Sequence, residues 1–171
     1  MDELPVTATR DDVVERDRQL WRERGLPDPD AMAGFMSFSR AYVAVQEAAR
    51  AALAPLDLSI AQFAALAHLE LCRPEPRSMG EISSRLLISP ARLTTIVGRL
   101  ESRGLVARST SPSDRRSTLV EITDAGRDSI ARASALLSDC RFGLASLDDE
   151  GLEDLTGLLR EIRRAGGDVD E

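Results

Sequence analysis

The 171-residue chain contains no lysine, one histidine and two cysteines. Its basic residues are therefore all arginines, whose planar guanidinium groups stay charged at any physiological pH. A single histidine, His68, cannot supply the several imidazoles of a histidine-rich metal site, and Cys72 and Cys140 are too few and too far apart for a zinc site. We therefore expect no metal and no cofactor.

The sequence also lacks a long apolar run. No segment approaches the roughly 20 apolar residues of a membrane-spanning helix, and the acidic N-terminus lacks the basic and apolar regions of a signal peptide. With 43% apolar and 30% charged residues, the composition is that of a globular domain, so we expect a cytoplasmic protein without membrane contact. No nucleophile-base pair, phosphate loop or pair of catalytic carboxylates is evident, so we expect no enzyme and no catalytic residues.

The net charge of -7 argues against a nucleic-acid partner, because phosphate binding depends on basic residues. The charge is unevenly distributed, however. Residues 1–30 and 128–171 carry net charges of -4 and -6, whereas residues 73–127 carry +4. An anion-binding surface is therefore expected in this basic middle segment.

Apolar residues recur at intervals of three and four along most of the chain, which predicts a mainly helical protein. A short helix is expected over residues 12–24, with Trp21 on its apolar side. A long helix then begins at Asp30, a candidate N-cap, and ends near Pro55. Both lie before the basic segment.

The middle of the chain has the element order of a winged helix-turn-helix. After a linker at residues 73–77, a short helix, a tight break and a second helix over residues 89–103 follow one another, and Gly104 ends the second helix. Residues 105–109 and 117–122 have the character of two strands joined by a polar loop. We therefore expect a mainly α fold with a small β-hairpin as the wing.

The C-terminal part is expected to be helical as well. Thr123 is a candidate N-cap, and apolar residues keep a three-four spacing from Ile130 to Leu147. A narrow apolar seam of this kind is typical of a helix that packs against a partner helix. A last helix starts at Asp148 or Asp149.

The helix over residues 89–103 has one face suited to DNA. Its apolar stripe is expected to turn inward, which leaves cations, hydroxyl donors and methyl groups on the opposite side or at its margin. These candidate DNA-binding residues are Ser89, Arg92, Thr94, Thr95 and Arg99. Gly98 lowers helix propensity by roughly 1 kcal/mol relative to alanine, which indicates a close approach by another part of the chain.

The loop between the two strands adds Arg115 and Arg116, next to Asp114, which could hold one of the two guanidinium groups. Narrow minor grooves attract inserted arginines. An isolated arginine pair is more often a solvated surface, but here it is combined with a helix-turn-helix and a wing. The combination predicts DNA binding.

These residues resemble the MarR (multiple antibiotic resistance type) family of regulators. The similarity covers about 70 residues, from Leu58-Ser59-x-x-Gln62-Phe63 through Ser89–Arg108 to the motifs Asp114-Arg-Arg-Ser and Thr123-x-Ala-Gly-Arg127. It implies a ligand-responsive repressor that binds a pseudopalindromic double-stranded DNA operator as a homodimer. In that arrangement the 89–103 helix occupies the major groove, and Arg116, oriented by Asp114, enters the minor groove.

The resemblance also implies three regions. Residues 1–57 would hold an appendage helix and the first dimerisation helix, and residues 58–123 the winged helix-turn-helix with its wing at 105–122. Residues 124–171 would form the C-terminal dimerisation helices. A small-molecule pocket is implied between the dimerisation region and the DNA-binding lobes.

The extra N-terminal helix resembles the urate-responsive branch of the family, although Ala64 stands where that branch has an acidic pocket residue. An aromatic or amphipathic effector would suit a pocket lined by aromatic residues. The candidate pocket residues are Trp21, Phe38, Tyr42, Phe63 and His68.

Several alternatives remain open. Trp21 could be a hydrophobic anchor, and His68 a hydrogen-bonded core histidine rather than a ligand contact. A redox role for Cys72 is the less favoured interpretation of that thiol. The alternative to a DNA-binding regulator is a winged-helix module that binds a ligand or another protein, because fold alone does not decide function.

Overall fold

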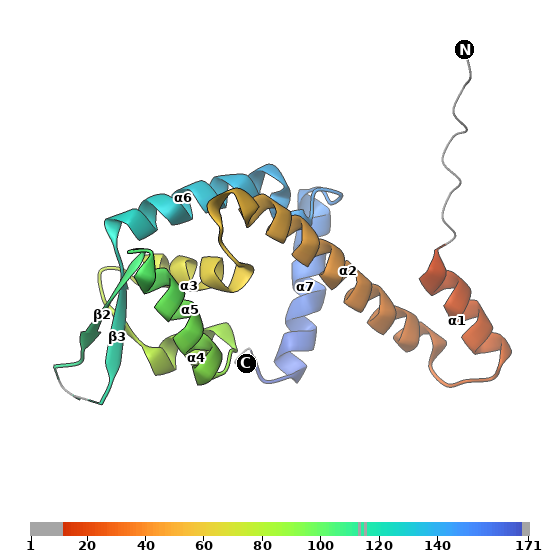
Figure 1. Ribbon diagram of the computed structural model, residues 1–171. Helices are drawn as coiled ribbons and strands as arrows, with labels where there is room; N and C mark the ends of the chain where they lie inside the picture. The colour runs from red at the N-terminus through yellow and green to blue at the C-terminus, as the bar shows by residue number, and fades with distance from the viewer. Residues whose placement is uncertain (1–11, 113, 115, 169–171) are drawn as a thin grey trace, which may run out of the picture. The chain divides into compact units, whose positions relative to one another are not determined.

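The computed structural model describes residues 12–112, 114 and 116–168 (Figure 1). The chain forms two compact units, Met1–Val45 and Gln46–Glu171, whose boundary falls within the long helix α2. The first unit holds α1 (Val13–Glu23) and the first part of α2 (Pro29–Leu53). Both helices were predicted.

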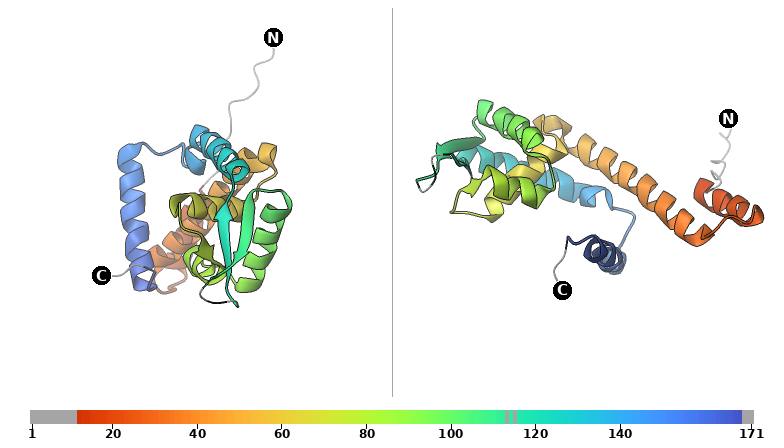
Figure 2. Two further views of the ribbon diagram at one scale, coloured as in Figure 1. Left: turned by 90° about the vertical axis from the view of Figure 1, so that its left-hand side faces the viewer. Right: turned by 90° about the horizontal axis from the view of Figure 1, so that it is seen from below.

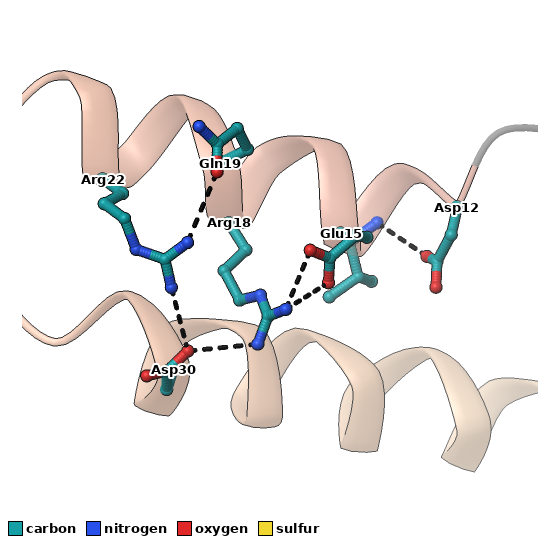
Figure 3. Close-up of polar contacts among 7 residues, drawn as sticks. Asp12, Glu15, Arg18, Gln19, Arg22 and Asp30 are labelled. Carbon is teal, nitrogen blue, oxygen red and sulfur yellow. Dashed lines mark hydrogen bonds and ion pairs between the residues drawn. The ribbon is translucent and has the colours of Figure 1, made fainter.

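Ion pairs join α1 to the first turn of α2 in the first unit (Figure 3). Arg18 lies 2.8 Å from Glu15 and 3.1 Å from Asp30, and Arg22 lies 3.4 Å from the same Asp30 oxygen. Asp30 is therefore not the N-cap that the sequence suggested, because α2 already begins at Pro29 and leaves Asp30 in its first turn. There the carboxylate complements the helix dipole and also holds α1.

The second unit contains the remaining helices. They are η1 (Ala54–Leu56), α3 (Ile60–Leu71), α4 (Met79–Leu86), α5 (Pro90–Ser102), α6 (Asp124–Asp139), η2 (Arg141–Gly143) and α7 (Asp149–Ala165). A side-chain oxygen before each of the five α-helices accepts a hydrogen bond from a first-turn N–H, which satisfies one of the free donors of the helix start. These N-caps are Ser59, Ser78, Ser89, Thr123 and Asp148.

A three-stranded antiparallel sheet adjoins α3, α4 and α5 (Figures 1 and 2). The predicted hairpin is confirmed as β2 (Val106–Thr110) and β3 (Thr118–Ile122), and Arg108 pairs with Val120. The third strand, β1 (Arg77–Ser78), pairs with the other edge of β3. It lies where the sequence suggested only a linker, because two residues are too few to show an alternating pattern.

The core of the second unit lies under α5. Leu93, Ile96, Val97 and Leu100 are all buried, as the apolar stripe of that helix predicted. They pack in one cluster with apolar residues of α3, α4, α6 and the sheet. The opposite side of α5 is consequently held at the surface.

The predicted apolar seam of the C-terminal region is interrupted. Helix α6 ends at Asp139, and Arg141 and Phe142 take positive φ angles of 46° and 55°, which no α-helix accommodates. The Phe142 ring lies 6.3 Å from that of Phe63, centroid to centroid. A tertiary aromatic contact thus overrides the three-four spacing, and the expectation of one seam up to Leu147 was wrong.

Two helices keep large apolar side chains exposed. No residue of α7 is buried, and Leu158 and Ile162 are 67% and 63% exposed. On α2 the only buried residue is Leu53. Among the described residues, no single helix is long and apolar enough to cross a membrane; the consecutive pair 29–56 and 60–71 meets that test only when counted together across its bend.

Candidate nucleic-acid interface

Leu87 and Ser83 shape the turn between α4 and α5. Leu87 takes a left-handed conformation with φ of 53°, and its side chain is 76% exposed, so it serves the turn rather than the core. The Ser83 hydroxyl donates to the Ile88 carbonyl at 2.6 Å, which closes the turn from the other side. Ser89 Oγ then accepts from Arg92 N at 3.4 Å and starts α5. The result is the tight break that the sequence predicted.

The outward face of α5 carries free cations. Arg92, Thr95 and Arg99 are exposed. In the described part of the chain, neither guanidinium group of this face has a hydrogen-bond or ion-pair partner. Both are therefore available to an anion.

The threonine hydroxyls of this face are less free than expected. Thr94 Oγ1 donates to Pro90 O at 2.9 Å, and Thr95 Oγ1 donates to Ala91 O at 3.3 Å. Serine and threonine often bond the carbonyl four residues earlier in this way. Their methyl groups and oxygen lone pairs, rather than their hydrogens, remain presented at the surface.

Arg108 of β2 connects the wing to α5. Its Nε lies 3.2 Å from Glu101 Oε2, and its Nη2 donates to the Thr94 carbonyl at 3.4 Å. A Cβ placed on Gly98 would lie 3.6 Å from the same guanidinium group, which is an ordinary contact. The unusually close approach expected at Gly98 is therefore not found. The role of Arg108 was not predicted, since no local sequence pattern marks a contact between a strand and a helix.

The wing tip is shaped by hydrogen bonds around Asp114. Its Oδ1 accepts from Arg116 N at 2.9 Å, and its carbonyl accepts from Ser117 N at 2.9 Å. Asp114 thus fixes the backbone of Arg116, while the Arg116 side chain is exposed. Arg115 lies outside the described residues.

The five candidate pocket residues are distributed over both units. In the first unit, Trp21 Nε1 donates to Pro27 O at 2.8 Å, and Phe38 and Tyr42 are 51% and 57% exposed. Trp21 also lines a cavity of about 420 Å³ that Phe38 and Tyr42 do not line. Its wall consists of Asp17, Leu20, Trp21, Arg24, Met32, Phe35 and Met36.

The two remaining pocket candidates lie on α3 in the second unit. Phe63 contacts Phe142, and His68 Nδ1 lies 3.7 Å from Cys72 Sγ. Partial burial, followed by the charges of Arg85 and Arg77, lowers the pKa of His68 below its ordinary value. The imidazole is consequently neutral near pH 7. In the part of the chain that the structure describes, no three His, Cys, Asp or Glu side chains are grouped as metal ligands would be.

A helix-turn-helix whose second helix presents unpaired arginines beside an arginine-tipped wing defines a winged-helix DNA-binding regulator. Comparison with known proteins supports the same class. A model of the MarR family matches residues 56–117. HTH-type transcriptional repressor Rv2887 of Mycobacterium tuberculosis is 32% identical over 113 residues, which make up 66% of this chain and 78% of that protein.

Two solved structures extend the similarity to the fold. Sco5413, a MarR family transcriptional regulator from Streptomyces coelicolor, is 34% identical with a TM-score of 0.76, over 83% of this chain and 99% of that one. The transcriptional repressor CouR, bound to a 23-mer DNA duplex, is 33% identical with a TM-score of 0.67, over 74% and 89% of the two chains. The chain belongs to the MarR family of transcriptional regulators, a family that does not consist of enzymes.

Proposed function

We propose that this regulator is a repressor that binds a pseudopalindromic operator as a homodimer and is released by a small ligand. Helix α5 enters the major groove through Ser89, Arg92, Thr94, Thr95 and Arg99. The wing places Arg116 in the minor groove, with Asp114 holding its backbone, and Arg115 is proposed as a further DNA contact. The observation that carries this assignment is the pair of exposed guanidinium groups of Arg92 and Arg99, on the face opposite the buried stripe of α5, for which the described residues offer no partner.

The proposed regions follow the sequence division. Residues 58–123 bind DNA, and residues 1–57 and 124–171 form the dimer. Support for the dimer comes from α7, which has an apolar side but no buried residue in the single chain. Leaving Leu158 and Ile162 in water forgoes about 1.5–3 kcal/mol each, which burial against a second copy would recover.

The proposed ligand is aromatic or amphipathic. Its candidate contacts are Trp21, Phe38 and Tyr42 in the first unit, and Phe63 and His68 in the second. The apolar wall of the cavity beside Trp21 supports this chemistry. The neutral state of His68 supports it as well, because an uncharged imidazole stacks against or hydrogen-bonds a ligand without a charge to compensate. The proposed similarity to the urate-responsive branch rests on helix α1.

The test begins with an operator selected from random duplex DNA by the wild-type protein. We expect Arg92→Ala, Arg99→Ala and Arg116→Ala each to weaken binding about 10- to 100-fold. Thermal stability should stay near wild type, because these side chains are exposed and unpaired within the described residues. Arg132→Ala, on α6, removes another exposed arginine that has no partner among the described residues, and it serves as the matched control.

Salt dependence separates the regulator from the protein-binding alternative. A DNA-binding regulator loses affinity linearly on a logarithmic scale of salt concentration, and each lost phosphate contact lowers the slope by about one. Absence of duplex binding by the wild-type protein at low salt would refute the proposed function and favour an adaptor. Unchanged affinity in Arg116→Ala would refute the assignment of the wing alone.

A further inference from the structure

The C-terminal end of α5 is bonded to two helices that are distant in sequence. Arg103, the C-cap of α5, donates through Nη1 to Asp57 O at 2.6 Å and through Nη2 to Leu56 O at 2.9 Å. Leu56 is the last residue of η1, and Asp57 is its C-cap, with a left-handed φ of 50°. Free carbonyls at a helix end attract a cation, and a guanidinium fork can bridge two of them.

Thr123, the N-cap of α6, holds the next two residues. Its hydroxyl donates to Gly104 O at 2.7 Å, and its backbone N–H donates to Leu105 O at 3.2 Å. The first turn of α6 lies directly against the same carbonyl, because a Cβ built on Gly126 would overlap Leu105 O. We call residues 103–105 the α5 junction.

From this geometry we infer that the α5 junction sets the angle of α5 to η1, at the C-terminal end of α2, and to α6, and that Arg103 is thereby a positioning residue for operator spacing. The inference rests on the proposed function, in which α2 and α6 belong to the dimerisation region and α5 reads DNA. Each half of a pseudopalindrome must meet one α5, with centres about 34–36 Å apart. A change in the angle of α5 therefore changes the half-site spacing that the dimer fits.

The chemistry of Arg103 is specific to its planar fork. The two terminal nitrogens of the fork, Nη1 and Nη2, each donate to one of two neighbouring carbonyls, which restrains both direction and distance. Lysine carries the same charge but presents it as a point, without a fixed plane. Arg103→Lys should therefore keep the charge and lose most of the restraint.

The experiment compares three duplexes: the operator selected by the wild-type protein, and the same operator with one base pair added or removed between its half-sites. One base pair rotates the half-sites by about 34° relative to each other. The spacing ratio is the affinity for the selected operator divided by the affinity for an altered one. We expect this ratio to fall about three- to tenfold in Arg103→Ala, a loss of up to 1.4 kcal/mol of discrimination, and to fall in Arg103→Lys as well.

Further measurements exclude other roles for Arg103. The salt slope should equal that of the wild type, whereas a slope lower by about one would identify Arg103 as a direct phosphate contact and overturn the inference. Arg132→Ala, which removes an arginine of α6 that has no partner in the described residues, should keep the wild-type ratio. Arg103→Lys supplies the same test if Arg103→Ala does not fold.

The outcomes for the two proposals differ. A wild-type spacing ratio in folded Arg103→Ala and Arg103→Lys would overturn the inference while leaving the proposed function intact. If the wild-type protein binds no duplex, the proposed function fails and the inference fails with it. A lowered ratio with an unchanged salt slope is the result that supports the α5 junction as the determinant of spacing.

Discussion

Gly98 lies in α5 and Gly126 lies in the first turn of α6. Substitution by alanine should change the free energy of unfolding in opposite directions at the two positions. Alanine is favoured over glycine by up to about 1 kcal/mol inside a helix. At Gly98 the new methyl group would meet only Arg108 Nη2, at 3.6 Å. Gly98→Ala should therefore raise the free energy of unfolding by about 0.5–1 kcal/mol.

At Gly126 the same methyl group would overlap the Leu105 carbonyl and lie 2.7 Å from Ile122 Cγ1. Ordinary contact needs about 3.5 Å, so the first turn of α6 has to move by about 1 Å. That movement stretches both bonds from Thr123 to the α5 junction, each worth about 1 kcal/mol, and adds an overpacking cost of about 1–3 kcal/mol. After the gain in helix propensity, Gly126→Ala should lower the free energy of unfolding by about 2–3 kcal/mol.

Thermal unfolding followed by circular dichroism distinguishes the two variants. For a chain of this length 1 kcal/mol corresponds to about 2–4 °C, so Gly126→Ala should lower Tm by about 5–10 °C, and Gly98→Ala should raise it by a few degrees. Protomer concentration has to be equal throughout, because a dimer unfolds at a concentration-dependent temperature. A Gly126→Ala protein as stable as the wild type would refute the close contact between α6 and Leu105.

Three further results are expected. His68 is the only histidine, so its ring proton resonance needs no assignment, and its pKa should lie below 6.5. Because the pKa is lowered in the folded state, the contribution of His68 to stability is present above pH 6.5 and is lost as the pH falls towards the folded pKa. His68→Asn should abolish this pH dependence of stability. Leu158→Asp with Ile162→Asp should shift light-scattering mass from dimer to monomer, and an unchanged mass would exclude α7 from the interface. Thr123→Ala should lower the free energy of unfolding by about 1–2 kcal/mol and Thr123→Ser by much less, and equal losses in the two variants would show that the cap hydroxyl is not what matters.

The sequence predicted those features that depend on local chemistry. The cap at Thr123 was placed correctly, since an N-cap and its bonding partner lie within three residues of each other. The inward stripe of α5 followed from helical periodicity for the same reason. The exposed face of α5, and with it the candidate DNA contacts, could therefore be anticipated.

Features that depend on distant partners could not be anticipated. Arg103 reaches Asp57 across 46 positions, and no pattern near Arg103 marks that contact. The end of α6 was missed because Phe142 packs against Phe63, which is still more distant in sequence. The glycine of the Thr-x-Ala-Gly motif could be noticed in the sequence, but its reason, the approach of α6 to Leu105, appears only in three dimensions.

The net charge of -7 at first opposed a nucleic-acid partner, and the structure explains why it does not. An approaching phosphate is attracted mainly by arginines that are not already paired with an acidic side chain of the protein. In the basic segment, Arg77 and Arg108 are paired with Glu81 and Glu101, and Arg127 is paired with Asp124. These arginines count towards the formal charge of the segment but contribute little to the attraction of an external anion.

The arginines of the proposed DNA-binding face differ from these. Arg92 and Arg99 on α5 and Arg116 on the wing have no acidic partner among the described residues. By contrast, Arg141, Arg163 and Arg164 in the acidic C-terminal region all pair with carboxylates. Arg132 on α6 and Arg160 on α7 also lack an ion-pair partner among the described residues. The lack of a partner therefore does not by itself single out the proposed DNA-binding face, whereas the position of its arginines on α5 and the wing does. Replacing Arg92 or Arg99 should lower the salt slope of DNA binding, whereas replacing Arg163 should leave it unchanged.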